Sequence, residues 1–211
     1  VVGVGMRLFS SRPGTVRMAD VRVTYARRHG ILAAIDSAIP MERIEIDGAG
    51  QIGMWLEQQR FDIAGAQPEV LQVNLQDISV RNTQRGMTLS GLEFEARRVR
   101  IEDSAHSGLM IIGSEGLLED AIIRDVGNQP DVGFYNLNRA WCRITSRPGF
   151  RVDCTTPEAS RVREQGTALY MCGYRWDSLP LFEANVSFSR VRVEDFALRG
   201  FGLDRFSGPQ M

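Results

Sequence analysis

Lysine is absent from this chain, and all 25 residues counted as Lys or Arg are arginine. The absence excludes a lysine general base and Schiff-base chemistry. Histidine is nearly absent too, with His29 and His106 alone. Long apolar runs are also missing, so no segment predicts a membrane-spanning helix, and we expect no membrane insertion. The formal net charge of −1 provides no overall positive field for nucleic acid, and we expect none as a partner.

Cysteine is too sparse and irregular for a zinc site. Cys142, Cys154 and Cys172 include no CxxC pair, and their odd number leaves at least one thiol free. We interpret them as small core residues, with a Cys142–Cys154 disulfide as the alternative. A phosphate loop, a dinucleotide fingerprint and a nucleophile elbow are missing as well, so the sequence indicates no cofactor.

The chain does contain a repeat. Ile78-Ser79-Val80 leads to Gly86, and Val99-Arg100-Ile101 leads to Gly108 in the same way; further copies are 21–23 with Gly30, 44–46 with Gly53 and 191–193 with Gly200. The regular copies are about 22–25 residues long, which is too short for a strand followed by a long helix. Apolar residues alternate with period two, which predicts strands and hence an all-β parallel solenoid.

Residues 80–91 and 101–114 resemble repeats of the right-handed parallel β-helix, or pectin-lyase-like, superfamily. The resemblance implies an all-β, right-handed parallel β-helix of about seven to eight rungs. We expect residues 1–211 to form one such domain within a longer chain, with loop insertions near 60–68 and 155–165. One fold of this kind supports many functions, so activity must be argued from individual residues.

The residues that follow each glycine predict which side chains point outward. The first and third residues are apolar and should face the core, as Met54 and Leu56 do after Gly53. The second and fourth should then form two outward rows, one rung apart. The second-position row is Arg7, Leu32, Trp55, Thr88, Met110, Tyr135, Arg151 and Gly202, and the fourth-position row is Phe9, Ala34, Glu57, Ser90, Ile112, Leu137, Asp153 and Asp204.

Two functions fit this mixed outward face. Aromatic rings beside carboxylates and arginine could stack on and hydrogen-bond sugars, with substrate-binding residues Trp55, Glu57, Tyr135, Arg151 and Asp153. Alternatively, the aliphatic members form a protein interface or lie under a covering segment; these are Met110, Ile112 and Leu137.

A candidate active site lies just before two of the repeat glycines. The resemblance implies paired aspartates in the superfamily's hydrolases, but Gln84-Arg85 stands in that place, whereas Ala105-His106-Ser107-Gly108 resembles the histidine segment of those enzymes. The departure argues against hydrolysis. If the chain is an enzyme, which stays open, it is a polysaccharide lyase or epimerase, with His106 and Arg85, expected on adjacent rungs, as its catalytic residues. The same pair could equally bind an acidic sugar without transforming it.

A further row lies two residues past each triplet, at Asn82, Asp103, Asp125 and Asp195. Stacked Asn and Asp side chains typically cap the turns of a solenoid, and we prefer this interpretation. Neighbouring arginines, Arg81, Arg100 and Arg124, should then neutralise the row. A calcium site is the alternative, since clustered carboxylates suit a hard cation, although the sequence has no calcium-loop motif.

The sequence therefore predicts a β-helix module that binds, and in one version processes, an acidic polysaccharide. Its expected locations are extracellular, periplasmic, or at a virion or cell surface. The alternative is a non-enzymatic structural or attachment module, such as part of a phage tailspike or fibre or a surface adhesin. In that case the apolar outer residues would pack against sister subunits, as in a homotrimer or a larger assembly.

Overall fold

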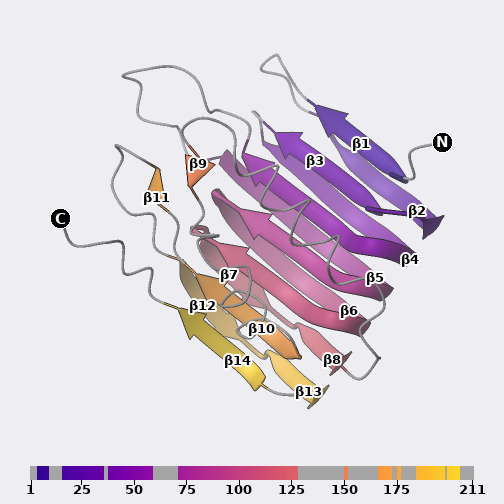
Figure 1. The fold of residues 1–211 in the computed structure, drawn as a ribbon. Helices are drawn as coiled ribbons and strands as arrows, with labels where there is room; N and C mark the ends of the chain where they lie inside the picture. Colours follow the sequence, from indigo (N-terminus) through magenta and orange to yellow (C-terminus); the bar gives the residue numbers. More distant parts are fainter. Residues whose placement is uncertain are drawn as a thin grey trace.

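The computed structural model describes residues 4–9, 16–35, 38–58, 71–127, 150–151, 166–172, 175–176, 184–197 and 199–204. These residues are mostly β-strand, and they include no helix that is long and apolar enough to cross a membrane. The strands are β1 (Met6–Phe9), β2 (Met18–Ala26), β3 (Ile31–Ile35), β4 (Ile39–Gln58), β5 (Leu71–Ser90), β6 (Leu92–Ile112), β7 (Glu115–Glu119), β8 (Ile122–Val126), β9 (Phe150–Arg151), β10 (Thr167–Cys172), β11 (Arg175–Trp176), β12 (Asn185–Ser189), β13 (Arg192–Phe196) and β14 (Arg199–Asp204) (Figure 1).

The expected all-β, parallel architecture is confirmed. Twelve strands form one sheet that runs through β1-β3-β4-β5-β6-β10-β14, with the remaining strands paired alongside it. Every pairing in this sheet is parallel. Figure 1 shows the strands stacked in chain order, from indigo β1 at one end to yellow β14 at the other.

Each of the three long strands bends twice, which divides the sheet into three ladders. The bends in β5 are at Asp77 and Asn82, with φ of 57° and 55°, and those in β6 are at Arg98 and Asp103. We call the length of chain that adds one segment to each ladder a pass. β7, β8 and β10 supply one such pass, pairing with the first, second and third segments of β6 respectively.

The core lies between the three ladders and consists of stacked apolar columns. Met54, Met87 and Leu109 are neighbours in register on the third ladder, as Ile44, Ile78 and Val99 are on the second. All are buried in one hydrophobic cluster, which confirms the predicted inward positions there. Burying a side chain of this size contributes about 1.5–3 kcal/mol.

The repeated glycines are explained by close approach between passes. A Cβ placed on Gly53 would lie 2.6 Å from the carbonyl oxygen of Gly86, and one on Gly86 would lie 2.6 Å from that of Gly108. These obstacles are backbone atoms of the pairing ladder, which a rotamer change cannot move.

The predicted register fails after Gly127. Residues 133–137 were expected to continue the third ladder after Gly108, but β10 occupies that place, with Leu169 beside Leu109 and Tyr170 beside Met110. The prediction that Arg151 lies in the outward row is also wrong, because β9 pairs with β11 in a separate antiparallel sheet. Tyr135, Leu137, Asp153 and the two expected insertions lie outside the described residues.

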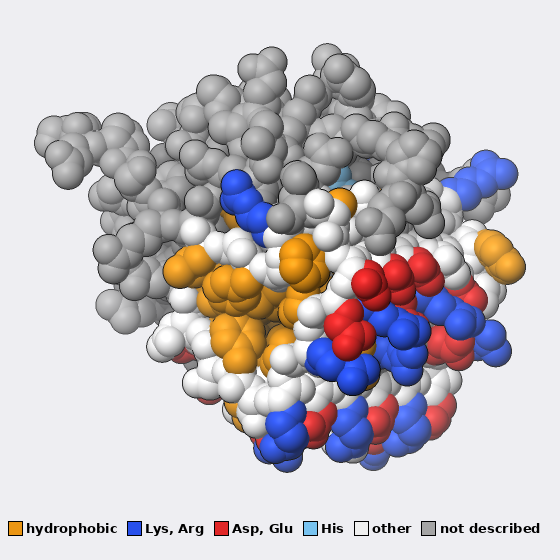
Figure 2. Space-filling model, turned by 90° about the horizontal axis from the view of Figure 1, so that it is seen from below, with side chains coloured by type: hydrophobic (Ala, Val, Ile, Leu, Met, Phe, Trp, Pro, Cys, Tyr) orange, Lys and Arg blue, Asp and Glu red, His pale blue; other side chains and the backbone are white. Residues whose placement is uncertain are grey.

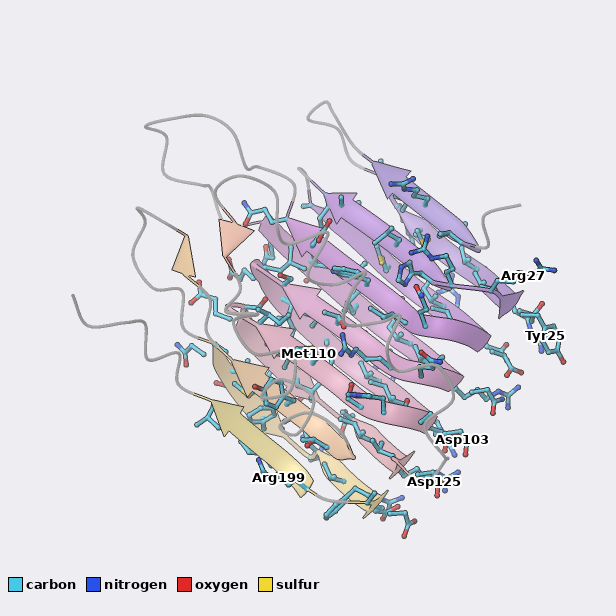
Figure 3. All side chains as sticks on the ribbon, in the orientation of Figure 1. Tyr25, Arg27, Asp103, Met110, Asp125 and Arg199 are labelled. Carbon is cyan, nitrogen blue, oxygen red and sulfur yellow. The ribbon has the colours of Figure 1, made fainter. Side chains whose placement is uncertain are left out.

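Side chains with positive φ line two corners of the stack. At one corner, the predicted turn residues Asn82, Asp103, Asp125 and Asp195 all have φ near +50°, as does Tyr25. Tyr25, Asp103 and Asp125 project along this same edge in Figure 3. The expected neutralisation is only partial: Arg124 lies 3.7 Å from Asp125, whereas Arg81 and Arg100 pair with Asp47 and Glu102.

The sequence analysis did not identify the row at the other corner. Its members have φ between 51° and 57° and alternate strictly in charge along the stack: Asp20, Arg43, Asp77, Arg98, Asp120 and Arg190. Arginine and aspartate pair bidentately at 2.5 and 2.7 Å for Arg43–Asp20 and at 2.5 and 2.9 Å for Arg98–Asp77. We call these six residues the charge column.

Candidate functional site

The candidate site is the outward side of the third ladder. The successive register neighbours there are Trp55 on β4, Thr88 on β5, Met110 on β6 and Tyr170 on β10. The order from Trp55 to Met110 is the one that the sequence predicts. Met110 lies midway along the ladder in Figure 3. Inward neighbours such as Met54 belong to the core cluster, whereas these four side chains do not.

This outward side is buried as well. Trp55 and Met110 are each 2% exposed, and Ile112 is 1% exposed. The sequence analysis expected an open groove lined by Trp55, and for Met110 and Ile112 either a protein interface or a position under a covering segment. The burial of Trp55 leaves no open groove at that residue, whereas the burial of Met110 and Ile112 agrees with the covered alternative. Of the expected sugar-binding residues, Glu57 is half-buried, and the side chain of Arg151 is not among those described.

Arg85 lies at the beginning of the third-ladder segment of β5. It pairs in register with Ser107 of β6, and its Nε donates a 3.1 Å hydrogen bond to Ser107 Oγ. The residue is 1% exposed, which is rare for a guanidinium. His106 directly precedes Ser107, so the two predicted catalytic residues come from adjacent passes, as expected from the repeat.

Both histidines are buried beside this arginine. Burial lowers the pKa of His106 to about 3, with a further contribution from the charge of Arg85. Burial likewise lowers the pKa of His29 to about 4, helped by Arg28, Arg85 and Arg7. Both imidazoles are therefore neutral at pH 7, and Arg85 supplies the positive charge between them.

Three polar atoms on His29 and its neighbours lack hydrogen-bond partners in the described part of the chain. They are His29 Nδ1, Trp55 Nε1 and Thr88 Oγ1. The His29 ring meets the Trp55 indole edge-on, with centroids 5.6 Å apart, and Thr88 is the register neighbour of Trp55. Burying each such group unsatisfied costs about 1–3 kcal/mol, so a bound ligand or ordered water is expected at these atoms.

The side chains gathered here are suited to binding one anionic, hydroxyl-rich group. Arginine is the side chain best matched to a carboxylate, and indole, imidazole and hydroxyl groups match sugar hydroxyls. A neutral imidazole can also accept a proton. Within the described ranges no cluster of three or more His, Cys, Asp or Glu could hold a metal, and the calcium alternative stays a prediction.

Sequence reasoning missed three contributors to this cluster. Thr88 stood in the predicted outward row without a role, and His29 was named only as one of the two histidines. Tyr170 was not considered, because the long interval between Gly108 and Gly166 leaves its place beside Met110 undetermined by the repeat. An outward position shared with Trp55 was the available signal for Thr88.

Comparisons with protein-family models, with curated proteins and with solved structures gave no match for this chain.

Proposed function

We propose that the passes of this chain are coils of a right-handed parallel β-helix of the pectin-lyase-like type, about seven to eight in number. Three observations support the proposal: consecutive passes pair in parallel on three ladders, the bends recur at fixed positions, and a glycine column accompanies the third ladder. On this scaffold, the outward side of the third ladder binds an acidic polysaccharide, in a protein that works outside the cytoplasm.

The binding proposal depends on one observation: buried polar atoms without hydrogen-bond partners follow one another from His29 to Trp55 to Thr88, and Arg85 lies near enough to His29 to lower its pKa. Arg85 would receive a sugar carboxylate, while the orphan atoms of His29, Trp55 and Thr88 would bond to hydroxyl groups. Half-buried Glu57 would contact the next sugar unit. Tyr135, Arg151 and Asp153 stay predicted contributors to the same site.

Ligand entry requires this face to open, because Trp55, Arg85 and Thr88 are almost fully buried. Association that waits for a conformational change is slower than the usual 10⁵–10⁷ M⁻¹s⁻¹ or so. We therefore expect slow association that levels off at high glycan concentration.

The processing version of the proposal is a lyase or an epimerase reaction, and both begin with loss of the proton at the sugar C5. His106, which is neutral at pH 7, would accept the proton at the sugar C5. In the lyase version, the electron pair left there would form a double bond as the C4–oxygen bond to the leaving sugar breaks, and the leaving oxygen would take a proton from water. Arg85 would neutralise the carboxylate and so stabilise the developing charge. Binding without cleavage is the simpler version and uses the same contacts.

The test is an affinity measurement on a panel of short oligogalacturonates, oligomannuronates and hyaluronan fragments. Arg85→Met should weaken binding of the tightest ligand by at least tenfold, and Arg85→Lys should recover only part of it, because lysine lacks the bidentate fork. Asn74→Ala, at an exposed position on the same strand, is the matched control and should bind like the parent protein. Absence of binding to every acidic glycan by a folded protein would refute the proposal.

The second candidate is a structural or attachment module, such as a tailspike, a fibre or an adhesin. It is favoured by the exposed aromatic residues at the C-terminal end of the stack, including Phe188 and Phe201. A trimer built through Met110 would require that side chain to become accessible. A folded, oligomeric protein without any glycan affinity would favour this candidate.

A further inference from the structure

Tyr25 is an exception at the corner between the second and third ladders. Its φ of 56° lies in the left-handed region, which bulky residues rarely adopt. The other passes place residues there that tolerate this conformation, namely Gly48, Asn82, Asp103, Asp125 and Asp195. Backbone strain of this kind persists mainly at functional sites, so this tyrosine indicates a role beyond forming the turn.

The Tyr25 ring is open to solvent, with 88% of the residue exposed. This exposure does not depend on where the stack begins, because Asn82 and Asp103 are exposed at the same corner with passes on both sides of them. The ring also extends over the following pass. Its Cδ1 atom lies 3.5 Å from the place that a Cβ on Gly48 would occupy.

Two glycines on that following pass leave the surface beside Tyr25 uncovered. Gly48 and Gly50 are the neighbours of Tyr25 and Arg27 across the ladder, and neither has a side chain that could cover them. A Cβ on Gly50 would collide with the carbonyl oxygen of Arg27, so a larger residue does not fit there. Figure 3 shows Tyr25 and Arg27 projecting from the same edge of the stack.

Arg27 differs from the arginines around it because its side chain has no partner among the described residues. Arg22 lies 3.4 Å from Glu45, and Arg28 donates a 3.3 Å hydrogen bond to Gln51. Arg27 is exposed, and its guanidinium forms no hydrogen bond or ion pair within the described ranges. Figure 2 shows basic and acidic side chains interleaved on the surface of the stack, so an arginine without an acidic neighbour is suited to an anionic ligand.

The chain leads from this corner directly into the proposed glycan site. Arg28 and His29 follow Arg27, and the Nδ1 atom of His29 is one of the orphan atoms of that site. His29 is 3% exposed, whereas Tyr25 and Arg27 are open to solvent. The backbone from Tyr25 to His29 spans at most about 14 Å. A glycan with one unit at the buried site can therefore place an outer unit at the corner.

We propose that Tyr25 and Arg27 form an exposed subsite for one acidic sugar unit of a glycan whose further units reach the buried site at Arg85. The apolar face of the sugar would pack on the tyrosine ring, and Arg27 would bind its carboxylate through paired hydrogen bonds. This subsite captures the glycan before the buried face opens, and contact at two places raises the overall affinity. The inference rests on the proposed function for its ligand class.

The test measures the affinity for oligouronates of increasing length, of the type that binds the parent protein most tightly. Tyr25→Asn removes the ring and installs the residue type that Asn82 provides at this corner, so the variant should unfold at the same temperature as the parent or a higher one. It should bind long oligouronates at least about tenfold more weakly and bind the single uronate like the parent. Tyr25→Phe keeps the ring and should retain the affinity for long oligouronates.

Arg27→Gln should weaken the binding of long oligouronates in the same way, and the remaining affinity should depend less on salt. Asn74→Ala, on an exposed position away from this corner, is the matched control and should bind every length like the parent. Unchanged affinity of Tyr25→Asn and Arg27→Gln for long oligouronates would overturn the subsite and leave the buried site standing, and so would an equal loss for short and long ones. A folded parent protein that binds no oligouronate would refute the proposed function and the subsite together.

Discussion

Arg98 donates two hydrogen bonds to the carboxylate of Asp77 on the preceding pass, at 2.5 and 2.9 Å. Both residues have positive φ, and both occupy the position immediately before the second-ladder segment. The repeat thereby places opposite charges one pass apart, where two like charges would repel. Solvent-exposed pairs of this type stabilise little individually, but a column of them constrains which pass can neighbour which.

Replacing Asp77 by Asn should make stability less dependent on pH in the acid range. The hydrogen bond from Arg98 lowers the pKa of Asp77 below its usual value of 3.8. A lowered native pKa contributes stability above the unfolded pKa, and this contribution is lost as the pH falls through the native value. Denaturant unfolding should therefore find the variant less stable at pH 7 and equal to the parent at the lowest pH.

The control for this substitution is Asp103→Asn at the other corner. Asp103 also has positive φ but forms no ion pair among the described residues. Its substitution removes a carboxylate from the same type of bend without removing an ion pair, so it should lower the free energy of unfolding at pH 7 by less than Asp77→Asn does. Equal behaviour of the two variants would contradict the role given to the charge column.

Substituting Thr88 and Thr83 by valine should have opposite effects. Thr88 Oγ1 is buried without a partner, so Thr88→Val should raise the free energy of unfolding by about 1 kcal/mol. Thr83 Oγ1 lies 3.4 Å from Ser104 Oγ in a buried pair, so Thr83→Val should lower it by a similar amount. Both residues are on β5. The two variants can be compared by chemical denaturation, with one shared slope for the dependence of the free energy of unfolding on denaturant concentration.

The two threonine variants also separate stability from function. If Thr88 Oγ1 is kept for a ligand, Thr88→Val gains stability and loses glycan affinity. Thr83→Val, whose side chain points into the core, should bind glycan like the parent. A stabilised Thr88→Val protein with full affinity would remove Thr88 from the site.

Buried His106 should make the protein less stable in mild acid. The pKa of this residue is about 3 in the native state, against about 6.5 when unfolded, so the unfolded chain binds an extra proton between these values. Stability is then complete above about pH 6.5 and falls as the pH decreases, by up to about 1.4 kcal/mol per pH unit for one histidine. His106→Gln should remove that share of the slope in unfolding titrations at pH 6, 5 and 4. An unchanged slope would show that the imidazole is not held neutral.

Replacing Gly86 by alanine should destabilise the fold strongly. The new Cβ would lie 2.6 Å from the carbonyl oxygen of Gly108, which cannot move without breaking the ladder. Overpacking of this kind costs about 1–3 kcal/mol, and we expect the upper part of that range. Asn74→Ala on the same strand controls for substitution at an exposed position and should change stability by less than about 0.5 kcal/mol.

Much of the fold is predictable because one short unit repeats. The alternation after Gly53, Gly86 and Gly108 correctly assigns the core residues, since period two fixes which side of a strand a residue occupies. The charge column could have been predicted in the same way, because its members stand directly before the apolar triplets of the repeat. Its members are polar and lie outside the apolar alternation that defines the core, so the core pattern alone does not reveal the column.

The remaining features depend on information that periodicity does not contain. Alternation places Trp55 and Met110 on the outward side but cannot say whether that side is open, and both are 2% exposed. The segment that follows Gly127 breaks the repeat, so β10 could not be aligned with β6 by counting residues. Arg151 was assigned to the outward row by the same counting, and it lies in an antiparallel pair instead.

The most direct test of the binding site observes the Trp55 indole itself. Its Nε1–H lacks an acceptor among the described residues, and its resonance in a ¹H–¹⁵N spectrum can be assigned from the signal lost in Trp55→Phe. On titration with the tightest-binding oligouronate, the account predicts a saturable downfield shift of this one indole proton, as it gains a hydrogen bond. A resonance that stays in place while the same oligouronate saturates the protein would put the ligand elsewhere and contradict the account.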